Sequence, residues 1–153
     1  MKLTQSSEMG IHAVWFLALE ARDTPMLSTE IARKAMVSET YLIKVLKRLV
    51  SAKILESRKG KKGGYRLKSD PRTLSLAEVV RACEMDPAVY ACQHDNRECR
   101  NETETCPVCV TMAKGERAMF DELGKTTIGD LVDFCMVRGR PVSEIVPRAG
   151  ARK

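Results

Sequence analysis

The chain has 153 residues, of which 44% are hydrophobic, and it carries a formal net charge of +6. This length and composition allow one domain with a sizeable core and some appendages. No run of about 18 apolar residues occurs, which excludes a membrane span. The N-terminus lacks the apolar stretch of a signal peptide, so we expect a cytoplasmic protein. Thiols stay reduced in that compartment, and the six cysteines therefore favour metal or redox chemistry over structural disulfides.

Charge is divided unevenly along the chain. Residues 1–74 hold 15 lysines and arginines against 7 acidic residues, whereas residues 75–135 hold 6 against 12. A basic first half beside an acidic second half predicts that a polyanion binds the first half and not the second. No phosphate loop, catalytic triad spacing or paired carboxylate motif is present, so we do not expect an enzyme.

Apolar periodicity predicts an amphipathic first helix over residues 5–22. Its expected core positions are Met9, Ala13, Val14, Phe16, Leu17 and Leu19. Glu8 and His12 are four residues apart, so they project from the same side of this helix. The pair is either a solvated ion pair or part of a site, and the pattern alone leaves both readings open.

Two shorter helices are expected next, over residues 29–35 and from Glu39 to about Lys53, with Ser28 and Ser38 as their N-caps. The expected core positions of the longer helix are Leu42, Val45, Leu46, Leu49 and Val50. Its opposite face is basic. Two helices joined by a tight turn, the second of them cationic, indicate a helix-turn-helix.

A β-hairpin is expected after the helix-turn-helix, with strands at 54–59 and 65–68 around the glycine-rich turn 60–64. A hairpin at this place is the wing of a winged helix. Four cations gather at its tip, namely Arg58, Lys59, Lys61 and Lys62. Crowded like charges destabilise a fold unless phosphates neutralise them, so the sequence predicts binding to double-stranded DNA.

The second half of the chain is expected to be helical. Ser75 and Glu78 fit a capping box that opens a helix over 76–84, in which Cys83 is a core residue. Pro107 suits the first turn of a long helix that reaches Leu123. Its apolar stripe consists of Val108, Met112, Gly115 and Met119, with Phe120 and Leu123 beside it. Such a stripe needs a partner surface, and a second copy of the helix gives a homodimer.

A last short helix is expected from Thr127 to Cys135, where Cys135 is structural. The fold class is therefore mainly α with a small β-hairpin: a winged helix-turn-helix plus a long C-terminal dimerisation helix. We assign residues 1–74 to the DNA-binding domain and residues 75–135 to a sensor and dimerisation region. The first helix is shared with the dimer and sensor site, and residues 136–153 form a loose basic tail.

Four of the six cysteines lie within eighteen residues, with the spacing C-x6-C-x6-C-x2-C: Cys92, Cys99, Cys106 and Cys109. Polar and turn-forming residues separate them, so a hydrophobic core cannot order this cysteine segment. Clustered thiolates bind soft metals. An iron–sulfur cluster, a closed four-thiolate zinc site and a metal-free thiol switch are all compatible with the spacing.

The chain resembles the Rrf2 family of winged-helix regulators over about residues 1–135. The resemblance rests on the opening Met1-Lys2-Leu3-Thr4, the recognition-helix entry Ser38-Glu39-Thr40-Tyr41-Leu42, the wing Gly60 and Gly63-Gly64-Tyr65, and the three-cysteine loop with its following helix. It implies a homodimeric repressor that binds a palindromic operator. The signal implied is redox state, nitric oxide or iron–sulfur status.

The resemblance also implies a 2Fe–2S or 4Fe–4S cluster bound by Cys92, Cys99 and Cys106. The further ligand varies within the family, and the implied candidates here are Cys109, or Glu8 with or without His12 from the partner subunit. Because some members bind no cluster, a zinc-bound or thiol-switched regulator of the same fold is an alternative. A redox carrier that docks an acidic partner through its basic surface is a second alternative function.

Position and resemblance together predict the residues that contact DNA. Those expected to face base edges are Thr40, Tyr41 and Lys44. Those expected at phosphates are Ser38, Lys47, Arg48, Lys61 and Lys62. Arg58 and Lys59 are expected to enter the minor groove.

Overall fold

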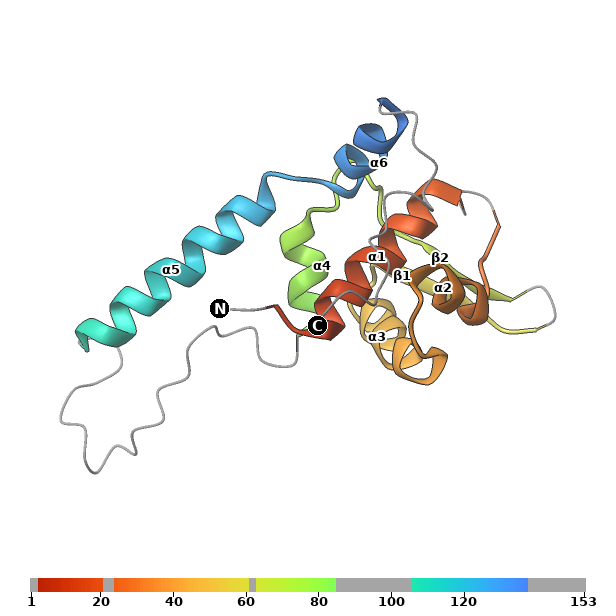
Figure 1. Cartoon of the computed structure of the whole chain (residues 1–153), viewed down its shortest axis with the longest axis horizontal. Helices are drawn as coiled ribbons and strands as arrows, with labels where there is room; N and C mark the ends of the chain where they lie inside the picture. Colours follow the sequence, from red (N-terminus) through yellow and green to blue (C-terminus); the bar gives the residue numbers. More distant parts are fainter. Residues whose placement is uncertain (1–2, 21–23, 61–62, 85–105, 138–153) are drawn as a thin grey trace, which may run out of the picture.

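The structure, a computed structural model, describes residues 3–20, 24–60, 63–84 and 106–137 (Figure 1). These residues form six helices: α1 (Gln5–Glu20), α2 (Ser28–Ala35), α3 (Glu39–Ser51), α4 (Leu76–Cys83), α5 (Pro107–Gly124) and α6 (Ile128–Val137). Two antiparallel strands, β1 (Leu55–Arg58) and β2 (Gly64–Leu67), complete the fold. The predicted mainly helical fold with one small hairpin is confirmed.

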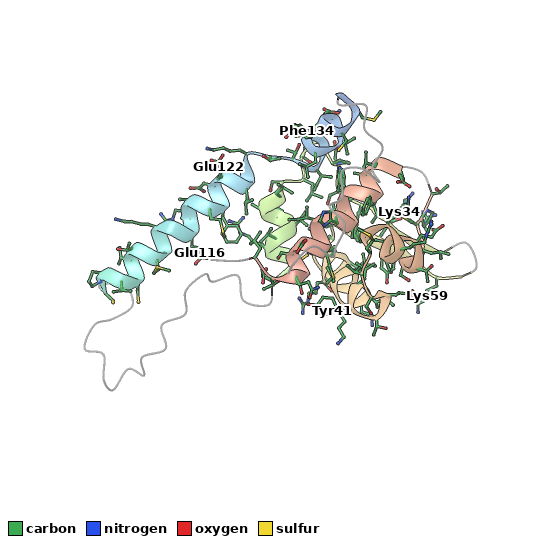
Figure 2. All side chains as sticks on the ribbon, viewed as in Figure 1. Lys34, Tyr41, Lys59, Glu116, Glu122 and Phe134 are labelled. Carbon is green, nitrogen blue, oxygen red and sulfur yellow. The ribbon has the colours of Figure 1, made fainter. Side chains whose placement is uncertain are left out.

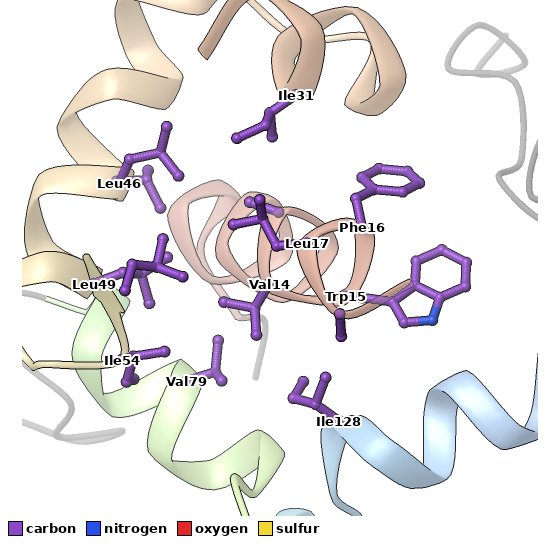
Figure 3. Close-up of a cluster of buried hydrophobic side chains, with 14 of the residues drawn as sticks. Val14, Trp15, Phe16, Leu17, Ile31, Leu46, Leu49, Ile54, Val79 and Ile128 are labelled. Atoms are coloured by element: carbon purple, nitrogen blue, oxygen red, sulfur yellow. The ribbon is translucent and has the colours of Figure 1, made fainter. Parts of the chain in front are cut away.

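Helix α1 is the centre of the fold. Its side chains are buried on every side from Ala13 to Ala18, and Val14, Phe16 and Leu17 are at most 1% exposed. Figure 3 shows these side chains pointing toward α3, α4 and α6 as well as α2. The predicted amphipathic pattern is therefore wrong for the second half of the helix. A helix that is apolar all round is covered on all sides, and here α6 packs against α1 together with α2, α3 and α4.

Helices α2 and α3 form the predicted helix-turn-helix. The expected α3 core residues Leu42, Val45, Leu46 and Leu49 are buried, and Met36 turns the chain between the helices with a left-handed backbone at φ 53°. Ser38 is the N-cap residue of α3, but its side chain makes no capping hydrogen bond.

Ser28 is not the N-cap of α2, contrary to the prediction. The N-cap is Leu27, whose N–H donates to Glu30 Oε2 at 3.1 Å. The Ser28 hydroxyl instead donates to Glu39 Oε1 at 2.7 Å. This bond ties α2 to the first turn of α3, so the hydroxyl serves the packing of two helices rather than the start of one.

The wing is anchored to the segment before α2. Met26 and Tyr65 exchange two backbone hydrogen bonds, with N–O distances of 2.9 and 2.8 Å. Gly64 lies at φ 140°, and a Cβ there would be 2.5 Å from the Met26 carbonyl oxygen. Only glycine allows that approach without strain, which gives a physical reason for the glycine pair at the end of the wing turn.

The second half of the chain packs on α1 through α4 and α6, while α5 stands off from the body with α4 between it and α1 (Figure 1). The predicted capping box of α4 is confirmed, since Glu78 N–H donates to Ser75 Oγ at 3.3 Å and Ser75 N–H to Glu78 Oε2 at 2.9 Å. Phe120 is the buried aromatic anchor of α5, against Ala77 and Val80.

The two cysteines of this half that were predicted to be structural, Cys83 and Cys135, are part of the core. Both side chains are buried. Among the described helices, none combines the length and the hydrophobicity that crossing a membrane requires.

Candidate nucleic-acid interface and cysteine site

The polar face of α3 is open to solvent. The predicted DNA-contacting residues that are exposed on it or at its start are Ser38, Thr40, Tyr41, Lys44 and Lys47. In Figure 2 the side chain of Tyr41 and that of Lys59 on the wing both lie along the lower right of the molecule. A cationic helix face beside a cationic hairpin suits a polyanion with regularly spaced phosphates.

Tyr41 and Arg48, both predicted to contact DNA, also have hydrogen-bond partners within the fold. The hydroxyl oxygen of Tyr41 lies 2.9 Å from Ser6 Oγ of α1. The half-buried Arg48 donates from Nη1 to the carbonyl oxygen of Cys83, at the end of α4, at 2.5 Å. A phosphate contact by Arg48 stays a prediction, and such a contact would compete with the bond to Cys83.

The charge of the wing is partly balanced by Glu56 on β1. Its carboxylate accepts a hydrogen bond from Arg66 and lies 3.5 Å from Arg58 Nε. The Arg66 hydrogen bond and the neighbouring positive charges lower the pKa of Glu56, against a smaller effect of burial. Glu56 is therefore ionised at neutral pH. Exposed Lys59 lies beyond this carboxylate, toward the tip, whereas Lys61 and Lys62 are outside the described residues.

The described part of the cysteine segment is its end. Cys92 and Cys99 lie outside the described residues, whereas Cys106 is the N-cap residue of α5 and Cys109 lies in the first turn. Hydrogen bonds from the backbone N–H groups of Cys109 and Val108 lower the pKa of the Cys106 thiol, and they outweigh its desolvation. A thiol whose pKa is lowered at a helix N-terminus is a soft sulfur donor, which fits an iron–sulfur cluster or zinc.

Glu8 and His12 lie on α1 near the surface, Glu8 exposed and His12 partly so. His12 Nδ1 is 3.0 Å from the Glu8 carbonyl oxygen. A histidine whose Nδ1–H donates to a carbonyl leaves Nε2 for a metal, and metal-binding histidines commonly have this arrangement. The ring also packs near Trp15, with 6.3 Å between ring centroids.

Among the candidate ligands that the structure describes, Glu8 and His12 of α1 are not grouped with Cys106 and Cys109 of α5. In Figure 1 the N-terminal end of α5, where Cys106 is the N-cap residue, lies at the far left, whereas α1 lies right of centre. In the described ranges, no three His, Cys, Asp or Glu side chains are close enough to hold a metal ion. Donation of Glu8 or His12 from a partner subunit to a group on Cys106 stays a prediction.

Sequence reasoning missed one polar network at the C-terminal end of α4. Glu84 Oε1 accepts hydrogen bonds from Thr4 N at 3.2 Å, Thr4 Oγ1 at 2.8 Å and Ser7 Oγ at 2.5 Å. Ser7 is fully buried. Its position on the buried side of α1 was the available signal, because a buried hydroxyl needs a hydrogen-bond partner.

Known proteins share both the sequence pattern and the fold. The Rrf2 family model, described as an iron-dependent transcriptional regulator, matches residues 3–134. The HTH-type transcriptional regulator NsrR of Bacillus subtilis is 30% identical over 132 residues, which are 86% of this chain and 90% of that protein. The protein rrf2 of Nitratidesulfovibrio vulgaris is 27% identical and is matched over 97% of this chain and 99% of its own length.

Solved structures agree on the fold. T. potens IscR superposes with a TM-score of 0.69 at 20% identity, over 92% of this chain and 93% of the other. CymR, the global cysteine regulator of B. subtilis, superposes with a TM-score of 0.67 at 22% identity, over 88% of this chain and 98% of CymR. The relatives are transcriptional regulators and not enzymes, and the match spans both the winged helix and α5. The chain belongs to the Rrf2 family of DNA-binding transcriptional regulators.

Proposed function

We propose that the protein is a homodimeric repressor whose affinity for a palindromic operator is set by an iron–sulfur cluster on the cysteine segment. Residues 1–74 bind DNA, and residues 75–135 hold the sensor and the dimer contact. The observation that carries the proposal is the placement of Cys106 at the N-cap and Cys109 in the first turn of α5, the helix that presents an exposed apolar face. When bound, a cluster supplies a centre that responds to oxidants, nitric oxide or iron supply.

In this proposal the DNA surface consists of the α3 face and the wing. Lys59→Ala combined with Lys61→Ala removes two cations, and each phosphate contact adds about 0.9 to the slope of log K against log salt. We expect weaker binding to every DNA sequence and a slope smaller by about 2. Lys114→Ala with Lys125→Ala is the matched control, because it removes the same charge from exposed positions on and just beyond α5. An unchanged slope in the wing variant would refute the wing contact.

The dimer contact is proposed for the apolar stripe of α5. Val108 is 54% exposed and Met112 36%, large fractions for apolar side chains on one face of a helix. Val108→Asp with Met112→Asp should shift the protein toward monomer in light scattering after size exclusion. Lys114→Asp, an exposed position on another face of α5, should leave the dimer intact. A dimer that survives both aspartates would place the contact elsewhere.

The cluster ligands proposed are Cys92, Cys99 and Cys106, with Cys109, Glu8 or His12 completing the set. Anaerobically purified Cys99→Ala protein should lose its visible absorbance and its bound iron and sulfide. Of Cys109→Ala, Glu8→Ala and His12→Ala, those that change the spectrum identify the remaining ligands. Stoichiometric zinc without sulfide, or no metal at all, would favour a zinc-bound or thiol-switched regulator instead.

A further inference from the structure

The C-terminal end of α4, which precedes the cysteine segment in the sequence, is fastened to α1. The Glu84 carboxylate follows the last residue of α4 and accepts three hydrogen bonds from Thr4 and Ser7. Partial burial of Glu84 raises its pKa, but these bonds and the charge of Arg48 outweigh burial, so the pKa lies below its ordinary value. Glu84 is therefore an anion held by the first turn of α1.

The same end of α4 is fastened to the recognition helix. Arg48 lies in the last turn of α3, and its guanidinium donates to the carbonyl oxygen of Cys83. A helix C-terminus carries a partial negative charge, so a cation placed there forms a charge-assisted bond. Arg48 thereby links the helix that reads DNA to the residue before Glu84.

Helices α1, α3 and α4 are in close contact beside these bonds. A Cβ added to Gly10 of α1 would lie 2.2 Å from Cys83 Sγ of α4 and 3.5 Å from Val45 Cγ1 of α3. Cys83 and Val45 are fully or almost fully buried. Close-packed side chains transmit a displacement rather than absorb it, so a shift of α4 must move α1 or α3.

A second link joins α1 to the other end of the recognition helix. The Tyr41 hydroxyl, in the first turn of α3, lies 2.9 Å from Ser6 Oγ. Ser6 is next to Ser7, which holds Glu84. The end of α4 therefore connects to the last turn of α3 through Arg48 and to its first turn through Ser7, Ser6 and Tyr41.

We propose that Glu84 and Arg48 are positioning residues that transmit the state of the cysteine segment to the recognition helix. The inference rests on the proposed function, since it names how that sensor reaches the DNA surface. In one state of the sensor Glu84 keeps its bonds to Thr4 and Ser7, and Cys83 keeps its bond to Arg48. In the other state these bonds are broken. Helix α3 then changes its angle to α1, and Arg48 becomes available to a phosphate.

The test is a ratio of operator affinities, measured by fluorescence anisotropy with the cluster-bearing and the cluster-free forms of each full-length variant. A coupled pair of sites typically differs by about 5- to 150-fold. Glu84→Ala and Ser7→Ala should each reduce the wild-type ratio by about fivefold or more. The double variant should reduce it no further than Glu84→Ala alone, because both substitutions break the same contact.

Glu78→Ala is the matched control. Glu78 is also a carboxylate on α4 with hydrogen bonds to backbone and hydroxyl, but it caps the opposite end of the helix. The Glu78→Ala substitution should lower the melting temperature about as much as Glu84→Ala does, but it should leave the affinity ratio at the wild-type value. Melting curves of the cluster-free proteins show that each variant is folded, and Glu84→Gln replaces Glu84→Ala if the latter is not.

The outcomes separate the two proposals. A wild-type ratio of one refutes cluster control of DNA binding, and the transmission proposal with it. A wild-type ratio well away from one that Glu84→Ala and Ser7→Ala both leave unchanged overturns the transmission proposal alone. A ratio that falls equally in Glu78→Ala also overturns it, because any loss of α4 stability would then have the same effect.

Discussion

The contact between Gly10 and Cys83 gives a prediction that can be worked through from the structure. Gly10→Ala adds a methyl group 2.2 Å from Cys83 Sγ, and Cys83 is fully buried, so the sulfur cannot rotate into solvent. Replacing glycine inside a helix by alanine normally stabilises it by about 1 kcal/mol. Overpacking a core costs about 1–3 kcal/mol. At a distance this short we expect the high end of that cost, and a net loss of about 2 kcal/mol.

The loss should disappear when the sulfur is removed. In Gly10→Ala with Cys83→Ala, the atoms nearest to the new methyl group are Val45 Cγ1 at 3.5 Å and the Cβ of residue 83 at 3.6 Å, and both distances are ordinary contacts. Cys83→Ala alone leaves a small cavity and costs about 1 kcal/mol. The double variant should therefore be more stable than Gly10→Ala and within about 1 kcal/mol of wild type.

Urea unfolding of the four cluster-free, reduced proteins measures each free energy. A loss of about 2 kcal/mol corresponds to a melting temperature lower by about 4–8 °C for a chain of this size. Two results would refute the packing argument: a Gly10→Ala protein as stable as wild type, or a double variant that shows only the sum of the two single losses.

Three further predictions follow from the same region and from α5. Burial raises the pKa of Cys83 to about 12, with Arg48 opposing this shift and Glu84 adding to it. Iodoacetamide should therefore leave Cys83 unmodified in the folded protein. Peptide mass spectra that show early labelling of Cys83 would contradict this prediction. Because the folded pKa of Glu84 is depressed from 4.5, its stabilisation is present above that pH and is lost as the pH falls through the folded value. The gap in melting temperature between wild type and Glu84→Gln should therefore shrink below pH 4.5, and a constant gap would count against the assignment. Phe120→Ala removes the ring that Arg81 covers at 4.4 Å and should cost about 3 kcal/mol in urea unfolding.

The local patterns of the sequence predicted the helix-turn-helix, the wing and α5, because apolar periodicity, glycines and caps act over a few residues. They did not predict that α1 is buried on all sides, since α6, which packs against it, comes more than a hundred residues later. Glu84 was missed for the same reason: its partners Thr4 and Ser7 are 80 and 77 residues away. Ser28 was misassigned because the local pattern shows a hydroxyl able to accept from the backbone N–H groups of the next helix, but not that the Glu39 carboxylate of α3 lies close enough to accept its proton.

Control of DNA binding by a soft metal group on the cysteine segment is most directly tested by one comparison. Operator affinity is measured for protein purified without air, and again after the group has been removed and every thiol blocked. We expect the first sample to be coloured, to contain iron and sulfide, and to differ from the second by at least about fivefold in affinity. A colourless, iron-free protein with the same affinity in both states would contradict the account and leave a metal-independent regulator.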